Sequence, residues 1–366
     1  MDLSALRSNA DVIRARVGPG CGIMAVVKAD AYGHGAVVVA RSLERRVWGF
    51  GVSLVEEGVE IRRAGVDAPI VVLGAFYGHD HRDLIAYRLT PVIGDAADLA
   101  RFRRAADDLG VERVDVHLKI DTGMSRLGIL PGAALEAFCD VLATVPGISL
   151  SGLMTHFHSA DDGDSEPSLQ QLARFEDARA QLASRGHVPQ LVHAANSAAM
   201  VRFPQARFGL VRPGLALYGL QPGPDANIPG LRPVMALKSR IVALREIAVG
   251  ESVSYGAQFR AVRRTRVATV AVGYADGYTR RLSGRAEVLV RGRRVPLIGA
   301  VTMDMCLVDV TDLDAAGLGD EVVLLGSQGE HRISADELAQ HTGTVSYEVL
   351  CAVSKRVPRV YTGERP

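Results

Sequence analysis

The chain has 366 residues, of which 48% are hydrophobic and 23% are charged. This balance is typical of a folded protein with substantial cores and argues against disordered and fibrous classes, and the length suits a large barrel with a companion domain. The 42 basic and 41 acidic side chains give a formal net charge of +1, so no global field gathers nucleic acid or an anionic membrane. We therefore expect a small-molecule partner.

The N-terminal segment from Met1 to Val17 alternates apolar and charged residues at helical spacing, unlike the apolar stretch of a signal peptide. No apolar run is long enough to span a bilayer. The cysteines are widely scattered and form neither a C-x-x-C pair nor a dense disulfide framework. We expect free thiols in a cytoplasmic protein. The cysteines are Cys21, Cys139, Cys306 and Cys351.

Up to about residue 215, short β-branched runs alternate with helical stretches such as 99–109 and 169–184. This alternation is typical of repeated βα units and a parallel sheet. Eight repeats predict an α/β fold that begins with a TIM-type (β/α)8 barrel. The predicted strands are 23–27, 48–52, 70–73, 91–93, 114–120, 148–154, 190–193 and 208–211.

A second domain is expected after the segment 221–233, where prolines and glycines break any regular element. We place the boundary so that residues 1–225 form the barrel and residues 226–366 form a C-terminal, mostly-β domain. Its strand-like segments are separated by turn residues and show little helical periodicity. These segments are 235–244, 266–272, 286–290, 295–298, 306–310 and 322–325.

Lys28 stands where the first predicted strand opens into a loop that contains Gly33 and Gly35. In a barrel, the carboxyl ends of the strands form the active-site face. Desolvation there lowers the pKa of a lysine and leaves a neutral amine that can form a Schiff base. The alternative is a lysine at the barrel rim that extends into water, which is the commoner case when Lys28 is considered alone.

Candidate phosphate-binding groups follow the last two strands of the predicted barrel. Asn196 and Ser197 follow the seventh strand, and Arg212 and Gly214 follow the eighth. TIM barrels commonly hold a phosphate at this junction, where a hydroxyl and backbone N–H groups can approach the anion. Gly214 alone could equally be an ordinary turn residue. Together with a Schiff-base lysine, a phosphate site would define a pyridoxal-phosphate pocket.

Nine short motifs run along the chain between Asp2 and Tyr361. They are 25–35, 119–128, 155–157, 193–197, 211–219, 254–256, 272–280, 303–304 and 347–350. In these motifs and in their order, the chain resembles the alanine racemase family. The resemblance implies a cytoplasmic enzyme that uses pyridoxal 5'-phosphate to interconvert L-alanine and D-alanine and supplies D-alanine for peptidoglycan. It also implies a barrel followed by a β domain.

The resemblance assigns two bases to the reaction. Lys28 binds the cofactor and moves a proton on one face of the substrate α-carbon, and Tyr255 of the partner subunit serves the opposite face. Two bases are needed because a single base that returned its proton to the same face would regenerate the starting enantiomer. The implied assembly is a head-to-tail homodimer with shared active sites. By itself, Tyr255 could be a half-buried strand tyrosine.

The resemblance also places Arg212 opposite the pyridine nitrogen of the cofactor, with His156 bridging Arg212 towards Tyr255. Because an arginine keeps its proton, the ring nitrogen would stay unprotonated and the cofactor would be a weaker electron sink. A weaker sink limits side reactions such as transamination. A rim salt bridge made by Arg212 is the structural alternative.

Substrate binding is implied for Arg126 and Met303. Arg126 resembles the residue that contacts the cofactor phenolic oxygen and the substrate carboxylate, and the Met303 backbone would complete the carboxylate site across the dimer. Lys119 resembles a lysine that is often carbamylated in the family, which would turn a like-charged neighbour of Arg126 into an attractive one. An unmodified strand lysine is the alternative.

Further contacts follow from the same resemblance, and no metal is expected. Tyr32 and Tyr347 match tyrosines that contact the phosphate, although either could be an ordinary packing residue. Asp276 and Asp304 match residues near the substrate entrance and receive no catalytic role. The expected cofactor contacts are Lys28, Tyr32, His156, Asn196, Ser197, Arg212, Gly214, Leu215 and Tyr347.

The sequence has three alternative interpretations of function. A racemase of broader specificity remains open, since serine differs from alanine by one hydroxyl. A related barrel decarboxylase would need a better electron sink and so an acidic residue where Arg212 stands. A non-catalytic carrier of the cofactor would need no second base, which Tyr255 argues against. The sequence departs from the family at one place, because the strand that precedes Asp2 is nearly absent, so the packing of this end is open.

Overall fold

The computed structural model describes residues 1–74, 76 and 80–363, which divide into two compact units. The barrel unit consists mainly of Leu3–Ala31 and Gly35–Arg232. The β unit consists of Met1–Asp2, Tyr32–His34 and Pro233–Thr362. Each unit has its own sheet, so each is described by itself.

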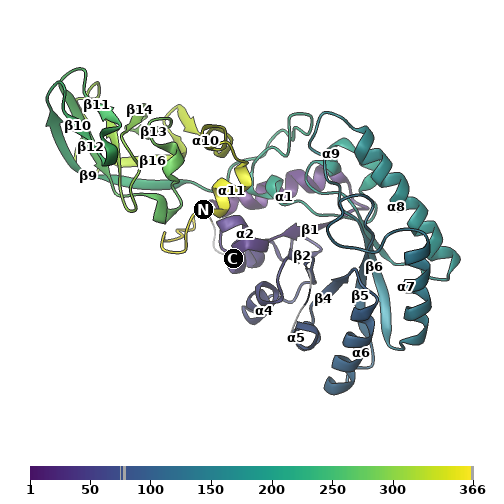
Figure 1. The fold of residues 1–366 in the computed structure, drawn as a ribbon. Helices are drawn as coiled ribbons and strands as arrows, with labels where there is room; N and C mark the ends of the chain where they lie inside the picture. Colours follow the sequence, from purple (N-terminus) through teal and green to yellow (C-terminus); the bar gives the residue numbers. More distant parts are fainter. Residues whose placement is uncertain (75, 77–79, 364–366) are drawn as a thin grey trace. The chain divides into compact units, whose positions relative to one another are not determined.

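Eight parallel strands form the sheet of the barrel unit, in the order β7-β6-β5-β4-β3-β2-β1-β8. Just past β7 and β8, which stand at the two ends of this order, the Arg212 N–H donates to the Ala195 carbonyl over 2.9 Å, so the sheet is nearly closed. The predicted (β/α)8 barrel is therefore confirmed (Figure 1). The strands are β1 Gly22–Val26, β2 Gly49–Val52, β3 Ile70–Val72, β4 Thr90–Ile93, β5 Val114–Lys119, β6 Ile148–Met154, β7 Leu191–His193 and β8 Leu210–Val211.

Several strands of the barrel are buried on both faces, which explains their continuous apolar runs. Every residue of β2 and β3 is buried. Met24, Val71, Val92, Met154 and Leu210 come from five different strands and pack into one apolar cluster. The core of this unit therefore lies inside the barrel, as the fold requires.

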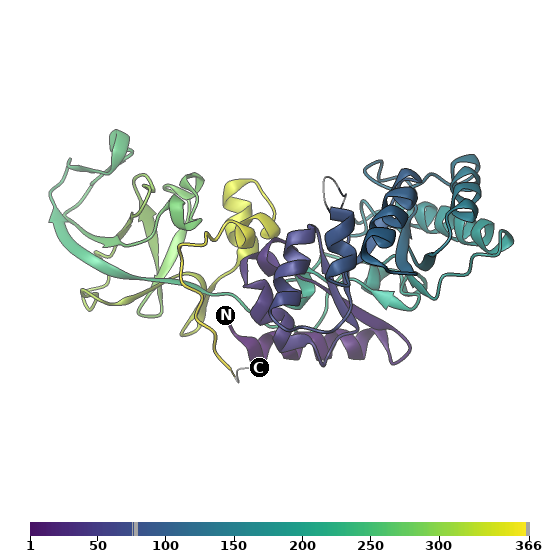
Figure 2. The ribbon, with the colours of Figure 1, turned by 90° about the horizontal axis from the view of Figure 1, so that it is seen from below.

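Helices follow the strands and lie around the outside of the barrel in Figures 1 and 2, where they run from purple to teal. The helix predicted at the N-terminus is α1, which buries Leu6 and Ile13. Within the described part of the chain, no helix is both long enough and apolar enough to cross a membrane. The helices are α1 Leu3–Val17, α2 Lys28–Gly33, α3 Ala36–Leu43, α4 Val55–Arg63, α5 Asp80–Ala86, α6 Ala97–Leu109, α7 Ala133–Thr144, α8 Glu166–Ser184 and α9 Ala199–Arg202, with 3-10 turns η1 Pro204–Ala206 and η2 Leu215–Tyr218.

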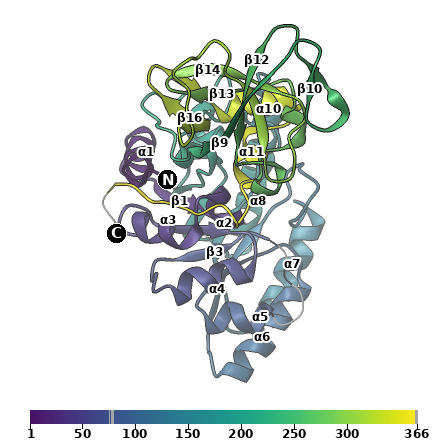
Figure 3. The ribbon, with the colours of Figure 1, turned by 90° about the vertical axis from the view of Figure 1, so that its left-hand side faces the viewer.

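The β unit contains a seven-stranded sheet in the order β13-β14-β15-β12-β9-β16-β17 and a small hairpin of β10 and β11 (Figure 3). An additional antiparallel pairing of β13 with β16 brings the sheet back on itself. The prediction of a mostly-β region is confirmed. The strands are β9 Leu237–Ile247, β10 Ser252–Val253, β11 Phe259–Arg260, β12 Thr265–Val270, β13 Glu287–Val290, β14 Arg293–Ile298, β15 Cys306–Asp309, β16 Glu321–Gln328 and β17 His331–Ile333.

Two short helices in the β unit were missed by the sequence analysis, α10 (Ala335–Thr342) and α11 (Ser346–Cys351). Ser334 is the N-cap of α10, a feature that the sequence could have indicated. Its hydroxyl accepts from the Glu337 N–H over 3.0 Å. Gly343 ends the helix with a φ of +69°. Both helices are too short to show a clear period of 3.6 residues. The 3-10 turns of this unit are η3 Tyr255–Ala257, η4 Tyr274–Asp276 and η5 Arg280–Leu282.

The first two residues are held by backbone hydrogen bonds within the β unit, which answers how this end packs. The Asp2 N–H donates to the Val234 carbonyl over 2.8 Å, and the Thr362 N–H donates to the Met1 carbonyl over 2.8 Å. The N-terminal ammonium donates to the Val360 carbonyl over 2.7 Å. All four cysteines are free thiols, as predicted.

Candidate active site

Lys28 is the first residue of a short helical turn that is left-handed. In α2, the four residues 29–32 have φ between +53° and +54°, so the turn is left-handed. Each L-residue other than glycine costs roughly 1–2 kcal/mol in this conformation. The Ala31 N–H still donates to the Val27 carbonyl over 2.8 Å, as in a helix. The segment after β1 is therefore strained, and other contacts must hold it.

A carboxylate from α4 supplies one of these contacts. Glu57 accepts from the Ala29 N–H over 2.6 Å and, through its other oxygen, from the Ser53 N–H over 2.8 Å. Asp30 accepts from the Ala36 N–H over 2.8 Å and closes the far side of the turn. These side chains fix the backbone next to Lys28. The sequence analysis missed Glu57, because an acidic residue in the first turn of a helix usually acts only as a cap.

Three cationic side chains of the barrel unit, Lys28, Arg126 and Arg212, act electrostatically on a fourth, Lys119. Lys119 is only 5% exposed, and burial lowers the pKa of its amine to about 8, helped by Arg126, Arg212 and Lys28 against the opposing effect of Asp121. All four side chains thus share a region of positive potential. Such a region favours an anionic ligand.

Arg212 is 3% exposed and has no carboxylate partner among the described residues. Its Nη1 donates to His193 Nδ1 over 3.0 Å and to the His193 carbonyl over 2.7 Å. Its Nη2 donates to the carbonyls of Thr155 and Ala194 over 2.8 and 2.9 Å and lies 3.3 Å from His156 Nδ1. Within the described chain, the Nε–H is thus the donor of Arg212 that has no acceptor. Complete burial lowers the pKa of this guanidinium to about 9.

His156 is neutral at physiological pH, because burial and then the nearby cations, led by Arg212, lower its pKa well below the ordinary value. An arginine can only donate, so His156 Nδ1 is the acceptor of the 3.3 Å contact and the imidazole proton sits on Nε2. His156 therefore presents a donor on the side away from Arg212.

The predicted phosphate groups lie together after β7 and β8. The Ser197 Oγ accepts from the Gly214 N–H over 3.0 Å, which leaves the hydroxyl hydrogen for another acceptor. The Gly214 N–H is therefore occupied by Ser197, whereas the Leu215 N–H has no partner among the residues that the structure describes. Asn196 accepts from the Ala199 N–H over 2.9 Å and so supports the start of α9.

Arg126 projects from a loop that its own residues shape. The Asp121 carboxylate accepts from the N–H groups of Gly123 and Ser125 over 2.9 and 3.1 Å. The Arg126 side chain is exposed and makes no hydrogen bond to any described residue. Its guanidinium is available for a carboxylate or a phenolate ligand.

Tyr255 and Met303 stand on exposed parts of the β unit, with 69% and 53% of their surfaces accessible. Ser254 has a φ of +62° and donates its hydroxyl to the Ala300 carbonyl over 2.7 Å, which fixes the backbone before Tyr255. The Met303 carbonyl accepts from the Ala275 N–H over 3.0 Å, and the Met303 N–H makes no hydrogen bond within the described residues.

The remaining predicted residues lie in the β unit. Tyr32 and Tyr347 pack with their ring centres 5.8 Å apart, and burial raises the pKa of Tyr32. Asp276 and Asp304 both pair with Arg356, over 2.6 and 2.7 Å. The two acids are thus tied to the C-terminal tail and are not free bases.

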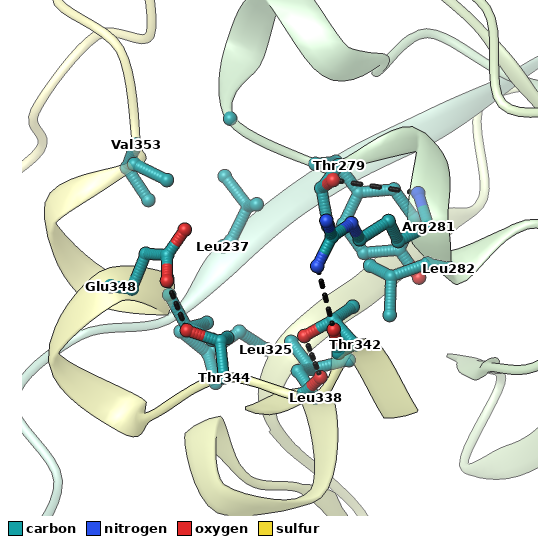
Figure 4. A pocket seen from close by; sticks show the side chains of 14 residues that line it. Leu237, Thr279, Arg281, Leu282, Leu325, Leu338, Thr342, Thr344, Glu348 and Val353 are labelled. Atoms are coloured by element: carbon teal, nitrogen blue, oxygen red, sulfur yellow. Dashed lines mark hydrogen bonds between the residues drawn. The ribbon is translucent and has the colours of Figure 1, made fainter. Parts of the chain in front are cut away.

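The β unit also contains a hollow of about 280 Å³, drawn in Figure 4. Its floor is apolar, and Glu348 and Arg281 lie on opposite sides of it. The hollow is lined by none of the predicted cofactor or base residues. Its balanced charge sets it apart from the cationic cluster of the barrel unit.

A barrel that gathers four cations and several donors without acceptors at the carboxyl ends of its strands is typical of a barrel enzyme whose site binds anionic groups. The profile of the alanine racemase N-terminal domain matches residues 1–222, and that of the alanine racemase C-terminal domain matches residues 234–361. The chain belongs to the alanine racemase family. It is an isomerase that interconverts L-alanine and D-alanine.

Whole-chain relatives support this assignment. The alanine racemase of Sorangium cellulosum is 47% identical, over 93% of this chain and 91% of the relative. The structure of an alanine racemase from Clostridium difficile is 34% identical, with a TM-score of 0.95 over 100% of this chain and 95% of that one. An alanine racemase from Bacillus anthracis with bound L-Ala-P is 35% identical, with a TM-score of 0.92 over 100% and 94% of the two chains. These similarities support the racemase and not the decarboxylase.

Proposed function

We propose that this racemase uses pyridoxal 5'-phosphate attached to Lys28. The observation that carries the proposal is Arg212, whose Nη hydrogens are taken by the protein while its Nε–H remains without an acceptor among the described residues. An unprotonated pyridine nitrogen is a fitting acceptor, and a protonated one is not. When bound, the cofactor supplies an electron-withdrawing ring that makes the α-hydrogen of an attached amino acid removable.

The residues present fit the anionic parts of this cofactor. The free Ser197 hydroxyl hydrogen and the Leu215 N–H can donate to a phosphate. We assign Tyr32 and Tyr347 to the phosphate from the family resemblance, and the packing of their two rings against each other is consistent with a shared role. Asn196 and Gly214 act here by supporting the backbone rather than by direct donation.

For the substrate, we assign the carboxylate to Arg126, whose guanidinium has no protein partner within the described residues. The N–H of Met303 would add a second donor from the partner subunit. Lys28 moves a proton on one face of the α-carbon, and Tyr255 of the partner subunit moves one on the other. The high exposure of Tyr255 supports this role, because a base that serves another subunit must lie on the surface of its own.

Lys119 is proposed to be carbamylated. Its lowered pKa of about 8 leaves about a tenth of the amine neutral at pH 7, far more than for an ordinary lysine. The neutral amine adds to carbon dioxide, forming an N–C bond and releasing one proton. The resulting anion would lie among the cations that now oppose Lys119 and would hold Arg126 in place.

The wider assignment follows from the same arrangement. We propose a head-to-tail homodimer in the cytoplasm, in which residues 1–225 hold the cofactor and residues 226–366 complete the site of the partner. The bound L-Ala-P of the Bacillus anthracis relative supports alanine as the substrate. Serine is the nearest alternative, and a comparison of kcat/KM for the two amino acids separates them.

Subunit mixing tests the shared site. Lys28→Ala and Tyr255→Phe homodimers should each be nearly inactive, whereas a mixed dimer has one doubly mutated pocket and one intact pocket. Random exchange makes about half of the dimers mixed, so activity should return to about a quarter of wild type. A pocket built within one chain could not recover in this way. No recovery after verified exchange would refute the trans arrangement.

A matched control uses the double variant of Lys28 and Tyr255 mixed with an equal amount of wild type. If the pocket is shared, every pocket of a mixed dimer lacks one residue. Activity should then fall from about half to about a quarter of an all-wild-type sample as subunits exchange. Activity that stays at about half contradicts the shared pocket.

A further inference from the structure

Two buried histidines are joined across a strand that separates them. His117 on β5 and His193 on β7 are linked by a 2.9 Å contact between Nδ1 and Nε2, although β6 lies between these strands in the sheet. Gly152 of β6 stands beside His117 in the strand register. A Cβ at Gly152 would lie 2.2 Å from the Cδ2 of His117. The imidazole can therefore reach over β6 because residue 152 has no side chain.

The hydrogen-bond partners allow one arrangement of protons. Arg212 Nη1 can only donate, so His193 Nδ1 is its acceptor at 3.0 Å. The proton of a neutral His193 is then on Nε2 and is donated to His117 Nδ1. His117 in turn carries its own proton on Nε2. Both rings are neutral, because burial lowers the pKa of His117 to about 4 and that of His193 well below its ordinary value.

We propose that His117 is a positioning residue for racemisation, which accepts the Nε2–H of His193 and so holds this ring, and through it Arg212, in its orientation, and that Gly152 makes this contact possible. The inference rests on the proposed contact between Arg212 and the cofactor. Without His117, the buried Nε2–H of His193 loses its acceptor. Arg212 still sets the tautomer, but the His193 ring would turn to find another acceptor, and its Nδ1 would turn away from Arg212.

The consequence reaches Arg212 because its Nη1 depends on His193 for both of its acceptors, the ring nitrogen and the carbonyl. Loss of the ring acceptor leaves one buried N–H of a cation unsatisfied. The guanidinium would rotate to find another partner, and its Nε–H would move with it. The protein groups that bind the substrate carboxylate are not touched by this change.

Three variants separate the contact from the general packing. His117→Leu removes the acceptor, His117→Gln restores one as an amide oxygen, and Gly152→Ala keeps both imidazoles but pushes them apart. Gly209→Ala is the matched control, since a Cβ there meets nothing within 4 Å and its φ is ordinary. The readouts are the ¹⁵N resonances of labelled histidines in the holoenzyme, assigned with His193→Gln, together with kcat, KM and the rate of transamination.

In wild type and in Gly209→Ala, His193 should have an unprotonated Nδ1 and a protonated Nε2. In His117→Leu and Gly152→Ala, the Nε2–H of His193 should lose the resonance shift of a hydrogen-bonded N–H, and kcat should fall about ten- to a hundredfold with little change in KM. His117→Gln should recover the hydrogen-bonded resonance and most of kcat. Because Gly152→Ala deletes no imidazole, it keeps the test valid if His117→Leu folds poorly.

A protonated Nδ1 of His193 in wild type, or an unchanged Nε2–H resonance in both His117→Leu and Gly152→Ala, would overturn the proposal. A lost hydrogen bond at Nε2 with unchanged kcat and unchanged transamination would also overturn it, because His193 would then not act through Arg212. A separate measurement tests the proposed contact between Arg212 and the cofactor, on which this inference rests. If Arg212→Glu leaves the ratio of transamination to racemisation unchanged, Arg212 does not face the cofactor, whatever the histidine resonances show.

Discussion

Replacing Lys119 by methionine removes a buried positive charge from the cationic cluster of the barrel unit. The amine has its pKa lowered from 10.5 to about 8, chiefly by burial. This difference corresponds to about 2 to 3 kcal/mol of lost stability when the protonated lysine is buried, after allowance for solvent screening. In buffer free of carbon dioxide at pH 7, Lys119→Met should therefore be more stable than wild type by about this amount.

The pH dependence follows from which state binds the proton. Below pH 8 the Lys119 amine is protonated in both the folded and the unfolded wild type. The free energy of unfolding of wild type is then lower than that of Lys119→Met by the full, constant amount. Between about pH 8 and 10.5 the unfolded chain still binds the proton and the folded one does not, so the free energy of unfolding of wild type rises with pH. The advantage of Lys119→Met should shrink through this window and vanish above it.

Equilibrium urea unfolding, followed by circular dichroism at one protein concentration, measures both effects. A second experiment adds bicarbonate, because a carbamate on Lys119 replaces a cation that its neighbours repel by an anion that they attract. Added bicarbonate should stabilise wild type and leave Lys119→Met unchanged. Equal stabilities of the two proteins at pH 7 would refute the electrostatic argument, and an absent bicarbonate effect would refute the modification.

Three further changes probe other parts of the site. Arg212→Glu should protonate the ring nitrogen and raise transamination relative to racemisation, measured as pyruvate formed per turnover. Gly33→Ala should destabilise the chain by about 1–3 kcal/mol in thermal or urea unfolding, because φ is +79° and the new Cβ would lie 2.6 Å from the Leu350 carbonyl oxygen. Glu57→Leu should cost about 1–3 kcal/mol, since it leaves backbone donors unsatisfied, and should speed loss of the cofactor absorbance on dialysis. Unchanged stability in either of the last two variants would mean that the turn after Lys28 relaxes freely.

The barrel could be predicted strand by strand because several of its strands are buried on both faces. Continuous apolar runs such as Ile70–Val72 stand out against the helical stretches on either side. The strands and helices of the β unit were harder to predict from the sequence. The two-residue strands β10 and β11 are too short to show alternation, and α11, with six residues, is too short to show a helical period.

The residues of the candidate site could be predicted from sequence motifs, but the residues to which they hydrogen-bond could not. Asp115, His117 and Lys119 alternate with apolar residues along β5, which indicates one polar face of a strand. Nothing local shows that His117 pairs with His193, since the two are 76 residues apart and the contact depends on a glycine in a third strand. Long-range hydrogen bonds of this kind are decided by register, which the sequence pattern leaves open by a residue or two.

The left-handed turn after Lys28 has a stereochemical consequence. Residues 29–32 together cost roughly 4–8 kcal/mol relative to ordinary conformations, an amount comparable to the whole stability of many domains. A D-residue has the mirror-image conformational map, so the same φ is its own minimum. A chain assembled by chemical ligation with D-alanine at positions 29 and 31 should unfold with a higher free energy than the all-L chain while keeping Lys28 in place. Inversion of the α-carbon, the change that the enzyme makes in its substrate, would relieve the strain beside Lys28.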